Sequence, residues 1–498
     1  MDAFAQLLQG FEGALTYYNI IYCFLGVTVG MLVGVLPGLG PTTATALLIP
    51  VSFGMEPVSA IIMLAGIYYG AMYGGTVTSV LINTPGEAAS VITCLDGHPL
   101  AKQGRAGAAL GIAGIGSFVG GTISLLALVF IGPPMAQFAL KFGPPEFFAL
   151  LVLGLVTVVG LMGKSLLRGV IAAFIGLSLS LIGTDPVSGV DRFIFGEPFL
   201  MGGLDLVSVC MGLFGLSEIL IGMENMSGAK KPHEVKGVLP RREEWWPSIK
   251  AISRGSILGL LIGLIPGTNS VIPTMLSYST EKKMAKDPSR FGNGAIEGVA
   301  GPETANNSYC GAALIPLFTL GIPSSPTIAI ILGAFIMHGL TPGPALFQER
   351  PEVVWAIIAS MFIGNLMLVV MNVPMAGFWA KITMVPEKLL YPIILAISIL
   401  GAYANSNSLW GVGIMLAFGL LGYFMKKLDV PMAPVILTFV LGKLIETSFL
   451  QSLRIFNGNM LAIFQRPLTG ALLGIAVLIL LLSVFSGFKK NLADDVEM

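Results

Sequence analysis

Long apolar runs separated by short polar stretches dominate the chain. A run of about 20 apolar residues can cross the hydrocarbon core of a bilayer as a helix. Such runs lie near residues 17–36, 58–82, 106–132, 146–163, 166–183, 204–223, 307–322, 326–340, 353–375, 388–402, 408–425, 431–446 and 468–487. Two further segments, 41–55 and 252–278, are apolar but interrupted by proline and glycine. The pattern predicts an all-α polytopic membrane protein with about 12 transmembrane helices plus re-entrant or broken helices.

The composition supports a membrane location. Hydrophobic residues make up 55% of the 498 positions and charged residues only 11%, whereas a soluble domain carries roughly 25% charged residues. Lys plus Arg and Asp plus Glu number 27 each, so the balance indicates no basic surface for nucleic acid. The four cysteines are isolated and show no Cys/His metal spacing, so we expect no disulfide framework, metal centre or other cofactor.

A charged segment, 224–254, divides the chain. Its basic residues are Lys230, Lys231, Lys236, Arg241, Arg242, Lys250 and Arg254. An excess of Lys and Arg in a short loop is typical of the cytoplasmic side of a membrane. We therefore expect a first repeat half with its following scaffold helices at 1–223, a cytoplasmic loop at 224–254, a second half with scaffold helices at 255–488, and a tail at 489–498.

The two halves repeat a pattern of glycines followed by a Pro-Gly interruption. The pattern reads GVTVGMLVGVLPG from Gly26 and GSILGLLIGLIPG from Gly255. Positions 26 and 255 differ by 229, as do the prolines at 37 and 266. A second, weaker correspondence pairs residues 82–86 with 320–324. Paired interruptions in corresponding halves are typical of transporters with binding sites near the bilayer midplane, so the sequence predicts two inverted-topology repeats.

The first pair of breaks carries candidate binding residues. A Pro-Gly pair inside an apolar helix frees backbone groups, which must be buried in protein or line a wet cavity. The candidates for binding an anionic substrate are Gly38, Gly40, Thr42, Thr43 and Gly267, because hydroxyls and helix N-terminal amides bind carboxylates. The alternative interpretation of each break is a packing kink.

The residues directly after the second Pro-Gly pair are candidates for a cation site. Thr268, Asn269 and Ser270 offer oxygen atoms, which are the ligands that hard cations prefer. Neither pair of breaks contains Lys or Arg. A bound Na⁺ would supply the missing positive charge, so the sequence favours co-transport of Na⁺ with an anion.

The other pair of breaks gives further candidates. Asn83, Thr84, Pro85 and Gly86 form one break, and its counterpart contains Ser324 and Ser325. We expect these residues to contact substrate. All four breaks, at Pro37, Pro85, Pro266 and Pro323, should converge if the halves are related by an axis in the membrane plane.

Glu303, Asn306 and Asn307 precede an apolar run. An ionisable residue at membrane depth suggests a functional site. Glu303 is equally compatible with a solvated first turn of a helix, so both interpretations stay open at this point.

Other functional classes find little support. The chain has no Walker motif, GxSxG elbow or HExxH sequence, so we expect no ATP-driven transport within the chain and no enzymatic activity. A membrane channel, or a permease for another small solute, is the alternative to secondary transport. Two pairs of interrupted helices favour alternating access over a channel filter.

Four segments resemble the TctA family, the large membrane subunit of tripartite tricarboxylate transporters. They are residues 34–57, 73–91, 263–283 and 301–325. The resemblance implies a secondary transporter in the bacterial inner membrane, with an elevator-like ion-transporter architecture in which a mobile domain carries substrate past a scaffold. It implies a small TctB-like membrane subunit, a periplasmic TctC-like solute-binding protein, and a citrate-like or other small carboxylate substrate moved by cation symport.

The segment 255–278 has basic residues at both ends. Arg254 precedes it, and Lys282, Lys283 and Lys286 follow it. Both ends would then face the cytoplasm, which predicts a re-entrant hairpin with its tip at Pro266 and Gly267.

Overall fold

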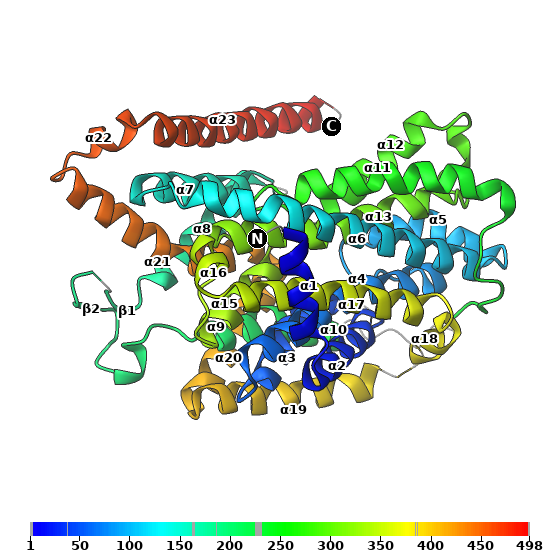
Figure 1. The fold of residues 1–498 in the computed structure, drawn as a ribbon, viewed down its shortest axis with the longest axis horizontal. Helices are drawn as coiled ribbons and strands as arrows, with labels where there is room; N and C mark the ends of the chain where they lie inside the picture. The colour runs from blue at the N-terminus through cyan, green and yellow to red at the C-terminus, as the bar shows by residue number, and fades with distance from the viewer. Residues whose placement is uncertain are drawn as a thin grey trace.

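The apolar runs form helices in the computed structural model, which describes residues 3–36, 38–161, 165–185, 187–224, 232–383, 385 and 387–496 (Figure 1). The elements up to residue 224 are α1 (Ala3–Ala14), α2 (Tyr17–Gly34), α3 (Gly40–Leu48), the 3₁₀ helix Ile49–Ser52, α4 (Pro57–Ile82), α5 (Val91–Lys102), α6 (Ala106–Ala139), α7 (Pro144–Leu161), α8 (Leu166–Ser180), β1 (Gly183–Thr184), β2 (Asp191–Arg192), the 3₁₀ helix Pro198–Leu200, α9 (Leu206–Cys210), the π-helical turn Met211–Leu216 and α10 (Ser217–Glu224).

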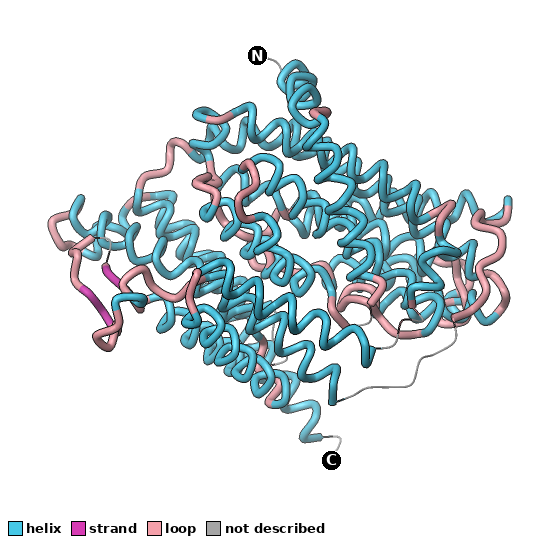
Figure 2. The backbone as a smooth tube through the Cα atoms, turned by 90° about the horizontal axis from the view of Figure 1, so that it is seen from below, coloured by secondary structure: helices cyan, strands magenta, loops and turns pink. Residues whose placement is uncertain are grey.

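The second part of the chain repeats the alternation of long helices and short broken ones. Its elements are the 3₁₀ helix Arg242–Glu244, α11 (Trp245–Gly263), α12 (Val271–Met284), the 3₁₀ helix Pro288–Arg290, α13 (Glu297–Ala312), α14 (Leu314–Leu320), α15 (Pro326–Met337), α16 (Pro344–Glu349), α17 (Pro351–Asn372), α18 (Ala376–Ile382), α19 (Glu387–Ser406), α20 (Leu409–Lys427), α21 (Met432–Ile455), α22 (Met460–Gln465) and α23 (Pro467–Val496). Strands β1 and β2 form one short antiparallel pair, which lies at one end of the long axis (Figures 1 and 2).

The prediction of an all-α polytopic membrane protein is confirmed in its coarse form. Among the described residues, 7 helices are long and apolar enough to cross a membrane: Tyr17–Gly34, Pro57–Ile82, Ala106–Ala139, Leu206–Glu224, Pro351–Asn372, Leu409–Lys427 and Met432–Ile455. Other apolar runs form shorter helices, such as Leu166–Ser180 and Pro326–Met337. The expected number of about 12 crossings and the elevator architecture stay predictions, because several runs fall short of a full span.

The repeated glycines serve the same purpose in both halves. A Cβ atom built on Gly30 of α2 would lie 2.4 Å from the carbonyl oxygen of Ile67 on α4. A Cβ atom built on Gly259 of α11 would lie 2.3 Å from the carbonyl oxygen of Ala305 on α13. Small residues at such faces let two helix backbones touch. The pair α2–α4 therefore corresponds to the pair α11–α13, while the inverted orientation of the halves stays a prediction.

Helices α11 and α12 double back on each other. The chain reverses between Gly263 and Val271, and Arg254 Nε, in the middle of α11, donates to Glu281 Oε1, in the last turn of α12, at 2.7 Å. This confirms the reversal expected for a hairpin rather than one broken span. The side of the membrane on which its ends lie stays a prediction.

Helix α13 differs from the sequence-based expectation. The apolar run at 307–322 suggested a span beginning near its polar flank, but the helix begins at Glu297 and ends at Ala312. All of its residues are buried, including Glu303 at 1% exposure. The interpretation of Glu303 as a solvated helix start is therefore wrong. Its polar side chains find partners on neighbouring helices, which a local hydropathy pattern does not reveal.

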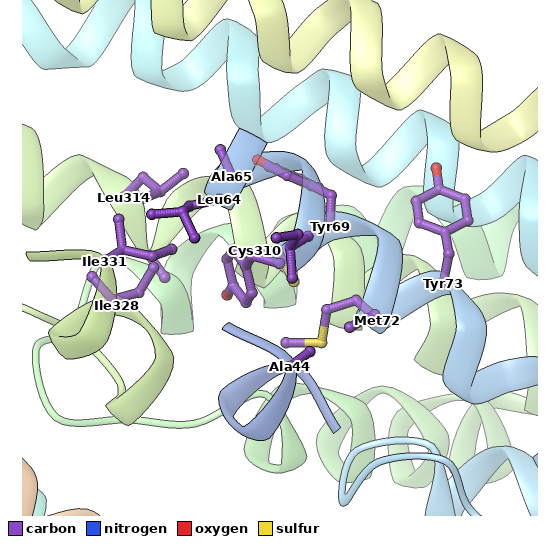
Figure 3. Close-up of a cluster of buried hydrophobic side chains, with 14 of the residues drawn as sticks. Ala44, Leu64, Ala65, Tyr69, Met72, Tyr73, Cys310, Leu314, Ile328 and Ile331 are labelled. Carbon is purple, nitrogen blue, oxygen red and sulfur yellow. The ribbon is translucent and has the colours of Figure 1, made fainter. Parts of the chain in front are cut away.

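Helix α4 lies at the centre of the protein, where every residue from Ser59 to Ile82 is buried. Figure 3 shows part of this core, in which Leu64, Met72 and Cys310 pack near Ala44 of α3 and Ile328 of α15. Helices α3 and α15, which each follow a break, thus pack against the same apolar centre.

Candidate functional site

A cavity of about 430 Å³ lies where the interrupted segments meet. Its lining residues from the four breaks are Gly38, Leu39, Gly40, Pro41, Thr42, Thr43, Pro85, Glu87, Ala88, Asn269, Ser270, Val271, Ser325, Pro326 and Thr327. Residues from α4, α5, the α9–α10 segment, α13 and α21 complete the wall. We call it the four-break cavity. Some residues of each break line this cavity; of the four prolines expected to converge, Pro85 lines it, Pro266 and Pro323 do not, and Pro37 lies outside the described residues.

The first break is shaped by two glycines with left-handed backbone. Gly38 has a φ of 82° and Gly40 a φ of 59°, conformations that glycine adopts without a steric penalty. The chain then enters α3, whose Thr43 donates from Oγ1 to the Phe214 carbonyl oxygen at 3.0 Å. Thr42 Oγ1 lies 2.7 Å from Thr327 Oγ1 of α15. A hydrogen bond thus joins the first break to the fourth across the cavity wall.

The counterpart break between α11 and α12 has most of its polar atoms paired internally. Thr268 Oγ1 donates to the carbonyl oxygens of Ile262 and Ile265 at 3.0 and 2.9 Å. Asn269 Oδ1 accepts from the amides of Val271 and Ile272 at 3.1 and 3.3 Å. These bonds satisfy helix-terminal backbone groups. Of the proposed cation ligands, Asn269 and Ser270 line the cavity and Thr268 does not.

The break after α4 folds the chain back beneath that helix. Asn83 ends α4 with a φ of 54°. A Cβ atom on Gly86 would lie 2.4 Å from the Gly34 carbonyl oxygen and 2.5 Å from Gly75 Cα. Gly86 therefore serves close packing and does not line the cavity. The next residue, Glu87, lies over Gly75 and reaches the cavity wall.

The break between α14 and α15 begins with Gly321, whose φ is 70°. Ser324 Oγ donates to the Ala313 carbonyl oxygen at 3.0 Å and is fully buried. Ser325 caps α15 and accepts from the Ile328 amide at 3.4 Å. Only Ser325 of these two serines lines the cavity.

Two carboxylates line the cavity, and no Lys or Arg does so among the described residues. Glu87 Oε1 accepts from Asn306 Nδ2 of α13 at 2.6 Å. Glu218 of α10 forms an ion pair with Lys426 of α20, which lies behind the lining. An anion in this cavity would meet amides, hydroxyls and carboxylates, so its binding requires compensating positive charge or protons on the carboxylates.

The sequence of the chain matches a family of transport proteins. Residues 20–437 match the model of the tripartite tricarboxylate transporter TctA family. The chain belongs to the TctA family. This membership supports the expectation that the protein is a multi-pass membrane transporter component and not an enzyme.

Two proteins of Agrobacterium vitis are similar to this TctA member. One, described as an uncharacterized 52.8 kDa protein in the TAR-I ttuC' 3' region, is 42% identical over 495 residues, which is 99% of this chain and 98% of the relative. Another, from the TAR-II ttuC' 3' region, is 41% identical over 233 residues, 47% of this chain and 96% of the relative. No solved structure matches the chain.

Glu303 lies in a buried polar network next to the cavity. Its carboxylate accepts hydrogen bonds from Thr76 of α4, at 2.6 Å, and from Thr93 of α5. Asn307 Nδ2 donates to Ser117 Oγ of α6 at 2.7 Å. The Oδ1 atoms of Asn306 and Asn307 are buried and have no hydrogen-bond partner among the residues that the structure describes. Polar atoms in this state are costly, which marks the face of α13 as a candidate for ligand or ion binding.

The structure separates the candidates of this TctA chain into two groups. Those lining the cavity are Gly38, Gly40, Thr42, Thr43, Pro85, Asn269, Ser270 and Ser325. Those outside the lining are Asn83, Thr84, Gly86, Gly267, Thr268, Ser324, Glu303, Asn306 and Asn307. In the second group, Gly267 packs against α7, where a Cβ atom would lie 2.6 Å from Val158 Cγ2. A binding role for the first group stays a prediction.

Two lining carboxylates were not among the sequence-based candidates. Glu87 directly follows a break, so its charge within an otherwise apolar stretch was a signal that could have identified it. Glu218 sits near the end of an apolar run, close to the charged loop. Only the packing of α10 against α20 and α19 brings it to the cavity.

Proposed function

We propose that this chain is the transport subunit of a tripartite carboxylate transporter in the bacterial inner membrane. It would move a citrate-like or other small carboxylate by alternating access, together with a coupling cation such as Na⁺. The observation that carries the proposal is the single cavity formed by breaks from both halves of a TctA chain. Its volume of about 430 Å³ is in the range of small-molecule sites.

The polar character of the cavity supports coupling to a cation. A carboxylate substrate entering beside Glu87 and Glu218 would be repelled unless positive charge accompanied it. The backbone of the breaks supplies amides for the anion and carbonyls for the cation. The hairpin tip at residues 264–270 borders the cavity through Asn269 and Ser270, and in the proposed elevator-like motion it would move with the substrate site.

The partners follow from the tripartite family. A small TctB-like membrane subunit would complete the membrane complex, and a periplasmic TctC-like binding protein would deliver the substrate. The family description supports this composition.

Reconstitution of all three subunits into proteoliposomes tests the proposal. Uptake of radiolabelled citrate and a panel of other carboxylates would be measured with Na⁺ or H⁺ gradients applied separately. We expect uptake of at least one carboxylate that depends on the binding protein and on one inward cation gradient. Uptake that depends on neither cation gradient would indicate a channel. Absence of uptake for every carboxylate in the panel would contradict the proposed substrate class.

A further inference from the structure

A second cavity, of about 540 Å³, lies along three helical segments that also line the four-break cavity. Helix α15 contributes Thr327 to the four-break cavity and Ile336 to the second one. Helix α21 likewise contributes Met432 to the four-break cavity and Lys443 to the second one, and the α9–α10 segment contributes Glu218 and Asp205 in the same order. These separations of 9 to 13 residues correspond to roughly 14–20 Å at the helical rise of 1.5 Å per residue. Helix α15 packs against both α9 and α21, and α9 and α15 lie side by side in Figure 1.

We call this second space the Lys443 cavity, after its basic lining residue. It is lined by Ile182, Phe199, Gly202, Gly203, Leu204, Asp205, Leu206, Val207, Gly333, Ile336, Met337, Asn405, Ser406, Phe439, Val440 and Lys443. Most of these side chains are apolar, and the charged lining groups are Asp205 and Lys443. A mostly apolar pocket with a few placed polar groups is the usual form of a small-molecule site.

Asp205, which also lines the cavity, and Glu446, on the same helix as Lys443, both have other partners. Asp205 caps α9, and its Oδ2 accepts from the Ser208 amide at 2.7 Å and from Asn405 Nδ2 at 2.5 Å. Glu446 lies one turn after Lys443 on α21 and holds Arg192 through two hydrogen bonds of 2.6 and 3.0 Å. Within the described chain, no carboxylate lies at ion-pair distance from Lys443 Nζ. The ammonium therefore remains available to a ligand.

The backbone of the loop before α9 fits closely around this ammonium. Gly203 has a φ of 85°, and a Cβ atom there would lie 2.9 Å from Lys443 Nζ. A larger residue would thus displace the ammonium. The Arg192–Glu446 pair joins the neighbouring β1–β2 hairpin to α21. The loop that carries Gly203 and the helix that carries Lys443 are therefore joined by a side-chain contact as well.

If the loop 224–254 is cytoplasmic, we expect the Lys443 cavity to lie toward the opposite side of the membrane. Residues Leu206–Glu224 are long and apolar enough to form one membrane span. The charged loop 224–254 follows the end of this span that lies near Glu218. Its other end, at Asp205, would then face the side from which a substrate is delivered.

We propose that the Lys443 cavity is a receiving site for a small carboxylate, in which Lys443 binds a carboxylate group before the substrate reaches the four-break cavity. The inference rests on the proposed transport function for the identity of the ligand. Lys443 gives this cavity a basic group that can pair with a carboxylate, whereas no Lys or Arg of the described residues lines the four-break cavity, and helices α15 and α21 extend along both cavities.

The first test measures charge selectivity without requiring transport. An Ile336→Cys variant, made with Cys94→Ser, places a thiol in the cavity wall. Its rate of reaction would be measured with an anionic sulfonate-bearing and a cationic ammonium-bearing methanethiosulfonate. We expect the anionic reagent to react faster than the cationic one, because a nearby positive charge concentrates anions. The ratio of the two rates should fall about fivefold or more when Lys443→Met is added. An unchanged preference would overturn the proposal.

The second test uses the assembled transporter. The substrate is citrate or whichever carboxylate the wild type takes up. We expect Lys443→Met to raise its apparent KM about tenfold, because one charge-assisted contact is lost, and to leave Vmax within about twofold of the wild-type value. Lys443→Arg should recover most of the affinity, and Lys141→Met, a change at an exposed lysine on the α6–α7 loop, should match the wild type. A normal KM in Lys443→Met would overturn the receiving site. Absence of carboxylate uptake by the wild type would instead contradict the proposed function, and the thiol-reaction test would still decide the anion preference.

Discussion

Thr42 Oγ1 and Thr327 Oγ1 lie 2.7 Å apart and connect the first turns that follow two breaks, one from each half of the chain. The residues are 285 positions apart in sequence, so this contact depends on the two halves being assembled around the cavity. It also leaves both hydroxyls at the wall of the proposed binding site.

We expect the two threonines to be energetically coupled. Thr42→Val or Thr327→Val alone should lower the free energy of unfolding by about 1 kcal/mol, because each leaves one hydroxyl without its partner. The double variant should cost less than the sum of the two. Denaturant unfolding of the purified protein measures all three values, and strictly additive costs would contradict the coupling.

Asn269 should have a capping role separate from any role in binding. Asn269→Ala removes the oxygen that accepts from Val271 and Ile272, which should cost about 1 kcal/mol of stability. Asn269→Ser is the matched control because serine keeps a capping oxygen.

Transport measured across a Na⁺ series then separates the roles of Asn269. If it binds the coupling cation, Asn269→Ala should require about tenfold more Na⁺ at equal membrane abundance, and saturating Na⁺ should restore uptake. A loss that persists at saturating Na⁺ would point to substrate binding. Unchanged transport at every Na⁺ concentration would leave capping as its function.

The carboxylate of Glu303 should be required for transport rather than for folding. Glu303→Gln keeps the shape and one oxygen acceptor, and the hydroxyls of Thr76 and Thr93 can rotate to meet an amide. We expect cation-coupled uptake to fall at least tenfold with little change in the unfolding midpoint. Glu303→Leu should also lower the free energy of unfolding by about 1–3 kcal/mol, because it leaves the hydroxyls of Thr76 and Thr93 without their hydrogen-bond acceptor. Normal uptake by Glu303→Gln would show that the network is structural.

The glycine faces should not tolerate a methyl group. Gly259→Ala would place Cβ at 2.3 Å from the Ala305 carbonyl oxygen, which forces α11 away from α13 and should cost about 1–3 kcal/mol. Gly413→Ala on α20 is the control, because no atom lies within 4 Å of its built Cβ. Thermal unfolding of the two variants checks the difference; equal midpoints would contradict the close contact.

The α11–α12 hairpin should present both of its ends to the same side of the membrane. Cysteines introduced as Lys250→Cys and Lys286→Cys should react with an impermeant thiol reagent from the cytoplasmic side only. The Arg254–Glu281 pair holds the two helices together near these positions. Labelling of the two sites from opposite sides would rule the hairpin out.

The sequence by itself determined the class of the protein and the places where its helices break. Apolar runs predict helices because each backbone group must be paired within its own segment in lipid. Gly38 and Gly267 mark their breaks because the left-handed backbone there is a local property of the chain. The repeated glycine faces were likewise visible, since helix contacts of this kind depend on residue spacing.

Only the tertiary structure decided which polar residues share the cavity. The contact from Glu87 to Asn306 spans 219 positions, and Glu218 reaches the wall only through the packing of α10. The sequence did not predict the buried start of α13, because the polar residues there are stabilised by partners on α4, α5 and α6. The hydropathy of the segment itself does not reveal these partners. Local patterns set where a helix can form or break, whereas the partners of a buried charge are set by helices that lie far apart in the chain.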